Sequence, residues 1–228
     1  MRPVTKGPAP PNAPFNAYPE ALEPLTEAVG WYCSYCERRL EVNLAIEHVQ
    51  PKSLTPALEL EWDNFLLACT NCNSTKGSQA IQLDDFYWPD ADNTVRAFVY
   101  EVGGVVDVDP ALTQAEQDIA RRTLELTGLD RRPGGPHEPT NTDRRWIFRR
   151  NAFDKAMDVR ADLQHFDSVL VRNLIRDLAV ATGYWSVWFT VFSGDADMRQ
   201  RLVDALPGTD PGSFDGNSIP VPRPGGAL

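Results

Sequence analysis

The sequence predicts an α+β fold, in which a small unit of two strands and one helix precedes a mainly α-helical region. Two observations predict the small unit: all four cysteines occur as two Cys-x-x-Cys pairs, and two short apolar runs lie between the pairs. A third observation is that apolar residues recur at helical spacing in the second half. We therefore expect a Pro-rich arm with a short helix at residues 1–30, the cysteine-containing unit at 31–90, and a hairpin, helices and an irregular tail at 91–228.

The first half of the chain supplies the elements of the small unit. Residues 1–19 are rich in proline and lack apolar periodicity, which predicts an extended arm, either packed on a surface or mobile. Residues 20–30 predict a short helix that ends at a glycine. The apolar run at 44–46 predicts a strand that continues into Glu47 and His48. A second strand is expected over 65–69, followed by a helix over 71–80.

The second half predicts a hairpin and then helices. Residues 96–100 and 102–108 predict strands that turn at two glycines. Thr113-x-x-Glu116 is a capping box, which satisfies free backbone N–H groups and opens a helix that a glycine closes. A Pro/Gly loop follows. Further helices are expected over 143–163, from 167, over 184–192 and over 198–206, before an irregular tail.

The aromatic segment at residues 184–192 has two open interpretations. Its aromatic and β-branched residues are compatible with helix or strand, and we favour a helix. Its large side chains, Trp185, Trp188, Phe189 and Phe192, indicate either core or a partner interface. The longer apolar stretch at residues 178–192 that contains it is shorter than a membrane span and is interrupted by polar residues and a glycine, so we expect no membrane partner. The first residues lack the apolar run of a signal peptide, which predicts a cytoplasmic protein with reduced cysteines.

The net charge of −10 is unusual for a protein that binds nucleic acid. Its distribution is uneven, because residues 1–112 carry −9 and residues 113–228 carry −1. Within residues 121–160, ten Lys and Arg outnumber six Asp and Glu. This basic strip either steers a polyanion or forms a solvated helix face, and the sequence leaves both open.

The cysteine spacing predicts a structural zinc site. Cys33 pairs with Cys36 and Cys69 with Cys72, and 32 residues separate the pairs. Two such turns complete a tetrahedron of thiolates and leave no open position for catalysis. Four unrelated buried cysteines would not explain the matched spacing, and a redox dithiol would leave the second pair unexplained. Zinc modules of this kind often stay unfolded without metal, because binding supplies on the order of 10 kcal/mol.

Five polar residues lie between and beside the cysteine pairs in a register that suits phosphodiester hydrolysis. Imidazole is a natural base near neutral pH, which assigns that role to His48. The carbonyl of Asn64 would hold the His48 ring in one tautomer. Glu47 and Asn73 offer oxygen ligands suited to Mg²⁺, and Lys76 offers a positive charge beside the phosphate. Taken singly, each residue has an ordinary explanation, and only their common register favours a site.

With these residues in place, the stretch resembles an HNH endonuclease of the ββα-metal type, in the form stapled by a Cys₄ zinc. The resemblance covers roughly residues 31–80. It implies that Glu47 and Asn73 bind the catalytic metal, that His48 is the general base, and that Asn64 orients it. The position of the family's last histidine is Asn73 here, which suggests Mg²⁺ or Mn²⁺ over a softer ion.

The run EHVQPKS…WDNFLLACTNCNSTKG is similar to prokaryotic HNH proteins of Septu-type anti-phage systems, in which the nuclease works with an ATPase partner. This resemblance implies DNA as substrate, with RNA as the other possibility, and a role in antiviral defence. The rival interpretation is a zinc-ribbon module that binds nucleic acid or a protein without cutting. A third combines the two, in that a partner supplies the DNA-binding surface that the acidic chain lacks. The sequence does not indicate the oligomeric state.

Overall fold

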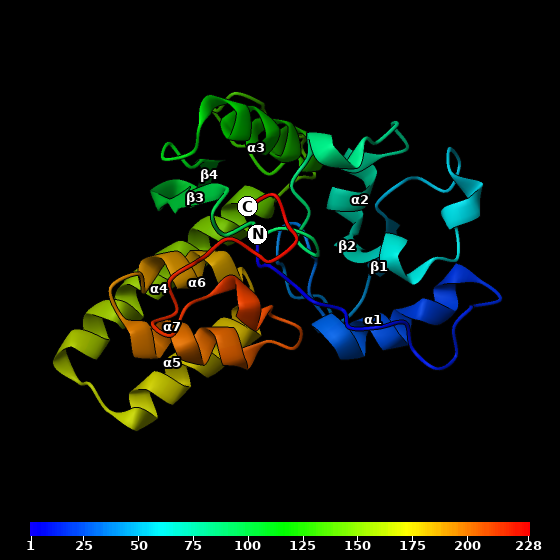
Figure 1. The fold of residues 1–228 in the computed structure, drawn as a ribbon. Coiled ribbons are helices and arrows are strands. Elements are labelled where there is room, and N and C mark those ends of the chain that lie inside the picture. The colour runs from blue at the N-terminus through cyan, green and yellow to red at the C-terminus, as the bar shows by residue number, and fades with distance from the viewer.

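Two small antiparallel sheets and the helices around them form the fold, which a computed structural model describes for residues 1–228 (Figure 1). The first sheet and α2 lie on one side, and α4 to α7 gather on the other. The elements are α1 (Leu22–Val29), β1 (Leu44–His48), β2 (Phe65–Cys69), α2 (Thr70–Lys76), β3 (Phe98–Glu101), β4 (Val105–Val108), α3 (Gln114–Thr127), α4 (Arg145–His165), α5 (Val169–Thr182), α6 (Trp185–Val191) and α7 (Ala196–Ala205).

The predicted strand–strand–helix unit is present. β1 and β2 are antiparallel, with Leu44 opposite Cys69 and His48 opposite Phe65. α2 begins directly after β2, and the sulfur of Cys69 caps it by accepting from the backbone N–H of Cys72. The helix ends at Lys76, earlier than predicted, because Gly77 adopts a positive φ of 61° that breaks the helical path.

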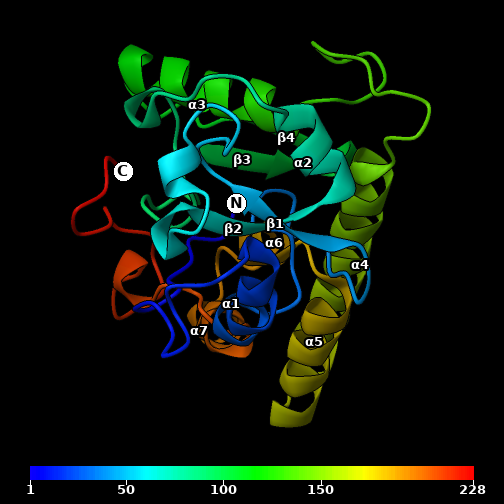
Figure 2. The same cartoon turned by 90° about the vertical axis from the view of Figure 1, so that its right-hand side faces the viewer.

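The predicted hairpin and capped helix are also confirmed. β3 pairs with β4 through a turn at Val102–Gly104. The capping box of Thr113 and Glu116 opens α3, and Gly128 closes it in the left-handed conformation. α3 covers this hairpin and contacts α2, so the second sheet joins the first through a helix (Figure 2).

The buried face of α4 corrects the interpretation of the arginine-rich stretch. Arg145 and Arg149 are 3% and 2% exposed, so neither belongs to a solvated face or to a strip that meets a polyanion. Arg149 donates from Nε to the carbonyl of Gly104 at 2.7 Å and from Nη2 to Leu129 at 2.9 Å. These arginines therefore bind loop and helix-end carbonyls inside the protein, a role that helical periodicity does not reveal.

The aromatic segment is the helix α6, and it belongs to the core. Trp185, Trp188, Phe189 and Phe192 are at most 1% exposed. Trp185 and Phe189 stack with ring centroids 4.6 Å apart. The partner-interface interpretation is therefore wrong for these side chains. No helix in the structure combines the length and hydropathy that a membrane span requires.

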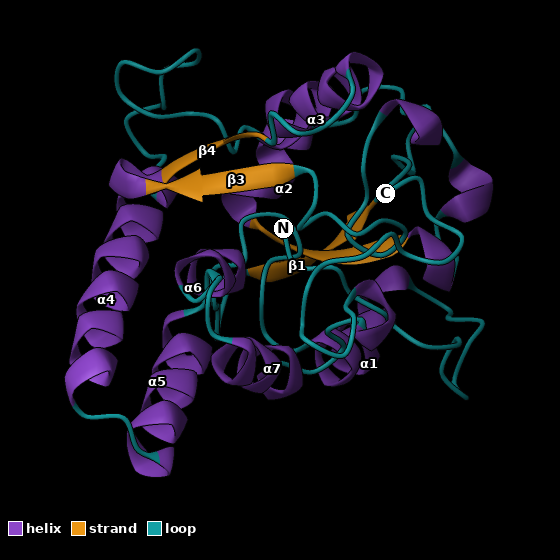
Figure 3. Cartoon of the chain, turned by 60° about the vertical axis from the view of Figure 1, so that its left-hand side comes forward, coloured by secondary structure: helices purple, strands orange, loops and turns teal.

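The N-terminal arm was predicted to be packed on a surface or mobile, but its first four residues are buried inside the protein (Figure 3). Met1 is fully buried, and Val4 pairs with Thr209 in an isolated bridge. The guanidinium of Arg2 donates to the carbonyls of Val29 and Pro207, each at 2.7 Å. One cluster of 50 buried residues runs through all parts of the chain. The division of the chain at residues 30 and 90 therefore stays a prediction, and no break in the hydrophobic core marks it.

Gly183, at the end of α5, lies where the helical region touches the cysteine-containing unit. It has a φ of 73° and pairs with Arg38 in an isolated bridge. A Cβ at this position would lie 2.7 Å from the carbonyl oxygen of Glu37 and 2.8 Å from the backbone nitrogen of Arg39. Only glycine therefore allows this backbone approach.

We expect Gly183→Ala to lower the stability by about 1–3 kcal/mol, because both the positive φ and the close approach must relax. Thermal unfolding monitored by circular dichroism measures the effect. Gly194→Ala is the matched control, since a Cβ there has no neighbour within 4 Å and φ is not positive. Equal melting temperatures for the two variants would show that this junction is not tightly packed.

Candidate metal centre and catalytic pocket

The four cysteine sulfurs form one buried cluster that can hold a zinc ion. The sulfurs of Cys33, Cys36, Cys69 and Cys72 all lie within 4.8 Å of one another, and none forms a disulfide. The sulfurs of Cys36 and Cys69 are 3.7 Å apart. Four zinc–sulfur bonds of about 2.3 Å require sulfurs about 3.8 Å apart at the edges of a tetrahedron. The donor set therefore fits a structural zinc, as the sequence predicts.

Backbone contacts of two turns bring the sulfurs together. In the first turn, Glu37 donates its N–H to the carbonyl of Cys33 at 2.9 Å, and Ser34 bonds the carbonyl of Leu67 at 2.8 Å. The second turn is the capped start of α2. Burial raises the pKa of the Cys33 thiol, because a thiolate there loses its hydration. A divalent cation would reverse this preference, since it stabilises thiolate directly.

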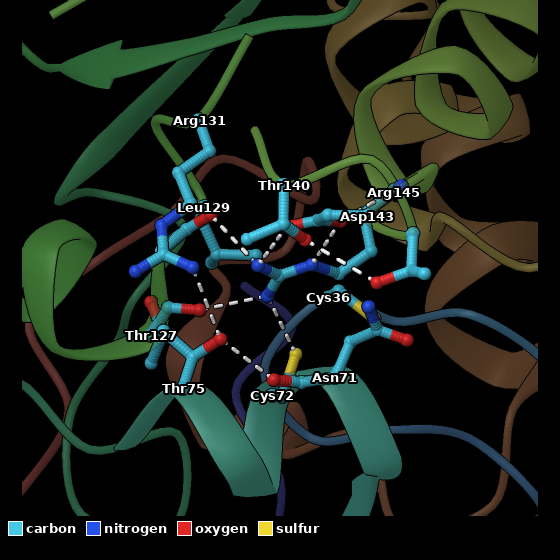
Figure 4. Close-up of polar contacts among 12 residues, drawn as sticks. Cys36, Asn71, Cys72, Thr75, Thr127, Leu129, Arg131, Thr140, Asp143 and Arg145 are labelled. Atoms are coloured by element: carbon cyan, nitrogen blue, oxygen red, sulfur yellow. Dashed lines mark hydrogen bonds and ion pairs between the residues drawn. The ribbon is translucent and has the colours of Figure 1, made fainter. Parts of the chain in front are cut away.

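Arg145 connects the cysteine cluster to the helical region (Figure 4). One guanidinium nitrogen donates to the sulfur of Cys72 at 3.1 Å and to the carbonyl of Thr127 at 2.7 Å. The other terminal nitrogen donates to the carbonyl of Gly128 at 3.0 Å and to the Asp143 carboxylate at 2.6 Å. A cation at this distance offsets the negative charge of four thiolates around one zinc. No local sequence pattern predicts this contact, because Arg145 lies 73 residues from Cys72.

Beside the cluster, a pocket of about 250 Å³ opens between β1, α2 and the arm. Glu47, His48 and Asn73 all line it, so the structure brings three of the predicted site residues together. Asn64 and Lys76 do not line the pocket and are 6% and 2% exposed. The other lining residues are Tyr18, Ile46, Pro51, Lys52, Ser53, Gly77 and Ser78.

His48 is held by a backbone carbonyl. Its Nε2 lies 3.0 Å from the carbonyl oxygen of Glu59. A carbonyl only accepts, so Nε2 carries the hydrogen and Nδ1 keeps a free lone pair. The rings of Tyr18 and Phe65 meet the imidazole edge-on, each with centroids 5.1 Å away. Burial lowers the pKa of His48, which favours the neutral imidazole that a base requires.

Asn64 occupies a different position from the one predicted. Its side chain does not contact His48, because both ends of its amide are bound to the connection between the strands. Oδ1 accepts from the N–H of Gln50 at 2.8 Å. Nδ2 donates to the carbonyls of Gln50 and Leu58 at 3.0 and 3.1 Å. Asn64 thus fixes the loop next to Glu59, and Glu59 in turn fixes the ring.

Lys76 is also placed differently from the prediction of a charge beside the phosphate. Its ammonium lies 2.7 Å from Oε1 of Glu47 and donates to the carbonyl of His48 at 2.9 Å. The Lys76 and Glu47 side chains are 1% and 3% exposed. Burial raises the pKa of Glu47, and the adjacent ammonium counteracts this. Lys76 therefore supports Glu47 from inside the protein.

Oxygen donors remain for a cation in the pocket. Oε2 of Glu47 takes part in no hydrogen bond within the chain. The side-chain amide of Asn73 takes part in none either. Both residues line the same pocket. A carboxylate and an amide oxygen are ligands that Mg²⁺ and Mn²⁺ accept, so the residues present fit a divalent metal.

Two further residues of the pocket escaped the sequence analysis. The ammonium of Lys52 lies 4.0 Å from the centre of the Tyr18 ring and 3.2 Å from the carboxylate of Glu59. Lys52 is the cation that lines the pocket, the role that the sequence analysis predicted for Lys76. The one sequence feature that points to Lys52 is its position four residues after His48. Tyr18 comes from the Pro-rich arm, which carries no pattern that predicts a catalytic role.

Comparison with known proteins shows what this region of the chain resembles. Residues 33–79 match the family model for HNH endonuclease. The Septu protein PtuB of Bacillus thuringiensis is 33% identical over 78 residues, which cover 32% of this chain and 30% of that protein. The match thus spans less than a third of the relative's length. The predicted α+β fold with a Cys₄ site in this region is confirmed.

We expect the purified protein to contain one zinc per chain, and Cys72→Ser to lose it and to unfold at lower temperature. Mass spectrometry of the metal content and thermal unfolding measure the two effects. Ser213→Ala serves as a control, because it alters a fully buried residue that bonds Asp210 and keeps all four sulfurs. Full zinc content in Cys72→Ser would contradict a four-thiolate site.

Lys76→Met should destabilise the protein by about 3–5 kcal/mol, because it leaves the buried Glu47 carboxylate without its partner. Chemical denaturation measures the loss. Adding Glu47→Gln to the same chain should restore part of the stability, since no buried charge remains. Lys155→Met, at an exposed position, is the control and should stay within about 0.5 kcal/mol. A Lys76→Met protein as stable as the parent would show that this ion pair is not a structural requirement.

Proposed function

We propose that the chain hydrolyses phosphodiester bonds in DNA at the pocket of Glu47, His48 and Asn73, because these residues lie within the stretch 33–79 that matches the HNH endonuclease family model. One observation carries the proposal: an imidazole with a free nitrogen and two oxygen donors without partners meet in a single pocket. A zinc-binding module that only docks a partner requires none of these groups.

His48 acts as the general base in the proposed reaction. Its Nδ1 takes a proton from a water molecule, whose oxygen attacks phosphorus as the bond to the leaving oxygen breaks. The Glu59 carbonyl keeps the ring in the tautomer that leaves Nδ1 free. Asn64 and the aromatic neighbours hold the ring in place, so little reorganisation is needed when substrate binds.

Glu47 and Asn73 would hold Mg²⁺ or Mn²⁺, and the ion would neutralise the charge that develops on the phosphate and leaving oxygen. Lys76 is a positioning residue in this scheme. Its bond to Oε1 of Glu47 fixes the carboxylate and leaves Oε2 for the metal. Lys52 is the cation at the rim that faces the incoming phosphate.

The biological setting follows from the similarity to a Septu protein. We propose that the chain is a nuclease of an anti-phage system, that it acts in the cytoplasm, and that an ATPase partner controls it. Reduced thiols suit such a compartment, because zinc requires free thiolates. In this proposal the nuclease unit at residues 31–90 cuts, and residues 91–228 hold it and present it to substrate and partner.

The direct test is plasmid nicking by the purified chain in Mg²⁺ or Mn²⁺. We expect His48→Ala to lower the rate at least 100-fold, in the range typical for loss of a general base. His137→Ala is the matched control, because His137 lies in a loop and pairs with Asp130 instead. Equal nicking by the parent and His48→Ala would exclude the assigned base. Tight DNA binding without cutting in any divalent metal would favour the zinc-binding module.

A further inference from the structure

A second pocket, of about 460 Å³, opens where the segment at residues 38–42 meets α4 and the end of α5. Arg38, Arg39 and Lys155 line it, and Glu41 is the single acid among the lining residues. Such an excess of positive charge stands out on a chain of net charge −10. A concave surface with this balance attracts anions.

Hydrogen bonds join one wall of this pocket to the start of α6. Arg38 pairs with Gly183, and Tyr184 donates its N–H to the carbonyl of Glu37 at 2.9 Å. The carboxylate of Glu37 is buried and accepts from the N–H of Ser186 at 2.8 Å. The first residues of the pocket are therefore locked to the start of α6. Cations on a fixed frame lose less entropy when a ligand binds.

Two of the cations are free to meet an anion. Arg38 and Lys155 form no ion pair, and Arg39 makes one contact of 3.5 Å with an exposed Glu41, which contributes little to stability. The Arg38 guanidinium lies 5.0 Å from the centre of the Phe148 ring, which is 41% exposed. Both residues line the pocket, and a cation–π contact of this kind uses no N–H group of the guanidinium, so these groups stay available.

The segment at residues 38–42 leads into β1, and Ile46, Glu47 and His48 of that strand line the proposed catalytic pocket. It ends at Val42, and the catalytic pocket begins at Ile46 on β1. Past the other end of β1, Val49 borders a pocket of about 560 Å³ that is lined by Asp63, Asp84, Asp90 and Asp92. A polyanion bound at the proposed catalytic pocket would therefore extend toward Arg38, Arg39 and Lys155 and away from these aspartates.

We propose that the pocket of Arg38, Arg39 and Lys155 binds the phosphate backbone of the DNA substrate on the stretch that flanks the bond that is cut. This inference rests on the proposed nuclease function. It gives the acidic chain a DNA-binding surface of its own, built where the nuclease unit meets the helical region.

The test measures binding without cleavage. The full-length His48→Ala protein is titrated with a fluorescent 30-base-pair duplex in Mg²⁺ between 50 and 200 mM salt. Adding Arg38→Gln and Lys155→Gln should weaken binding roughly tenfold and lower the salt slope by about 2, because each phosphate contact contributes about 0.9. Adding Arg121→Gln instead, which removes an exposed arginine on α3, should change neither value.

A second variant separates lost charge from lost structure. Arg38→Lys with Lys155→Arg keeps both charges and should retain the salt slope of the parent. An unchanged affinity and slope in the double glutamine variant would overturn the proposal. The proposal would also be overturned if that variant kept the salt slope of DNA binding but no longer bound a partner protein. The pocket would then be a protein-docking surface. Because no cleavage is measured, failure here is distinct from failure of the proposed activity.

Discussion

Four buried sulfurs placed to share one ion are the constraint on which the rest of the structure depends. One cysteine pair lies in the turn before β1, and the other spans the junction of β2 and α2. A single zinc would therefore fix both the turn and the start of the helix, in a unit too small to bury its own core. Arg145 extends this constraint to α4, since its guanidinium joins the Cys72 sulfur to the end of α3.

A second constraint, the buried ion pair of Glu47 and Lys76, shapes the proposed catalytic pocket. Burial of two charges costs free energy, and such a pair adds little net stability compared with apolar residues. Its value here is geometric, because the ammonium binds Oε1 of Glu47 and also the carbonyl of His48. The backbone of the base and the proposed metal ligand are thus held by one side chain.

Local patterns predicted the elements of the fold well, and long-range contacts explain what they missed. The two strands, the capping box of Thr113 and the α6 helix follow from neighbouring residues. The roles of Asn64 and Lys76 depend on which carbonyl or carboxylate the chain brings opposite them. Arg145 shows the same limit, because a buried arginine and a solvated one look alike in a helical pattern.

The most direct measurement is anomalous diffraction from crystals soaked in Mn²⁺, with data at the zinc and manganese absorption edges. The account predicts one zinc peak within the four sulfurs and one manganese peak between Glu47 and Asn73, with His48 facing it. Manganese bound elsewhere, or a zinc peak away from the sulfurs, would contradict the account.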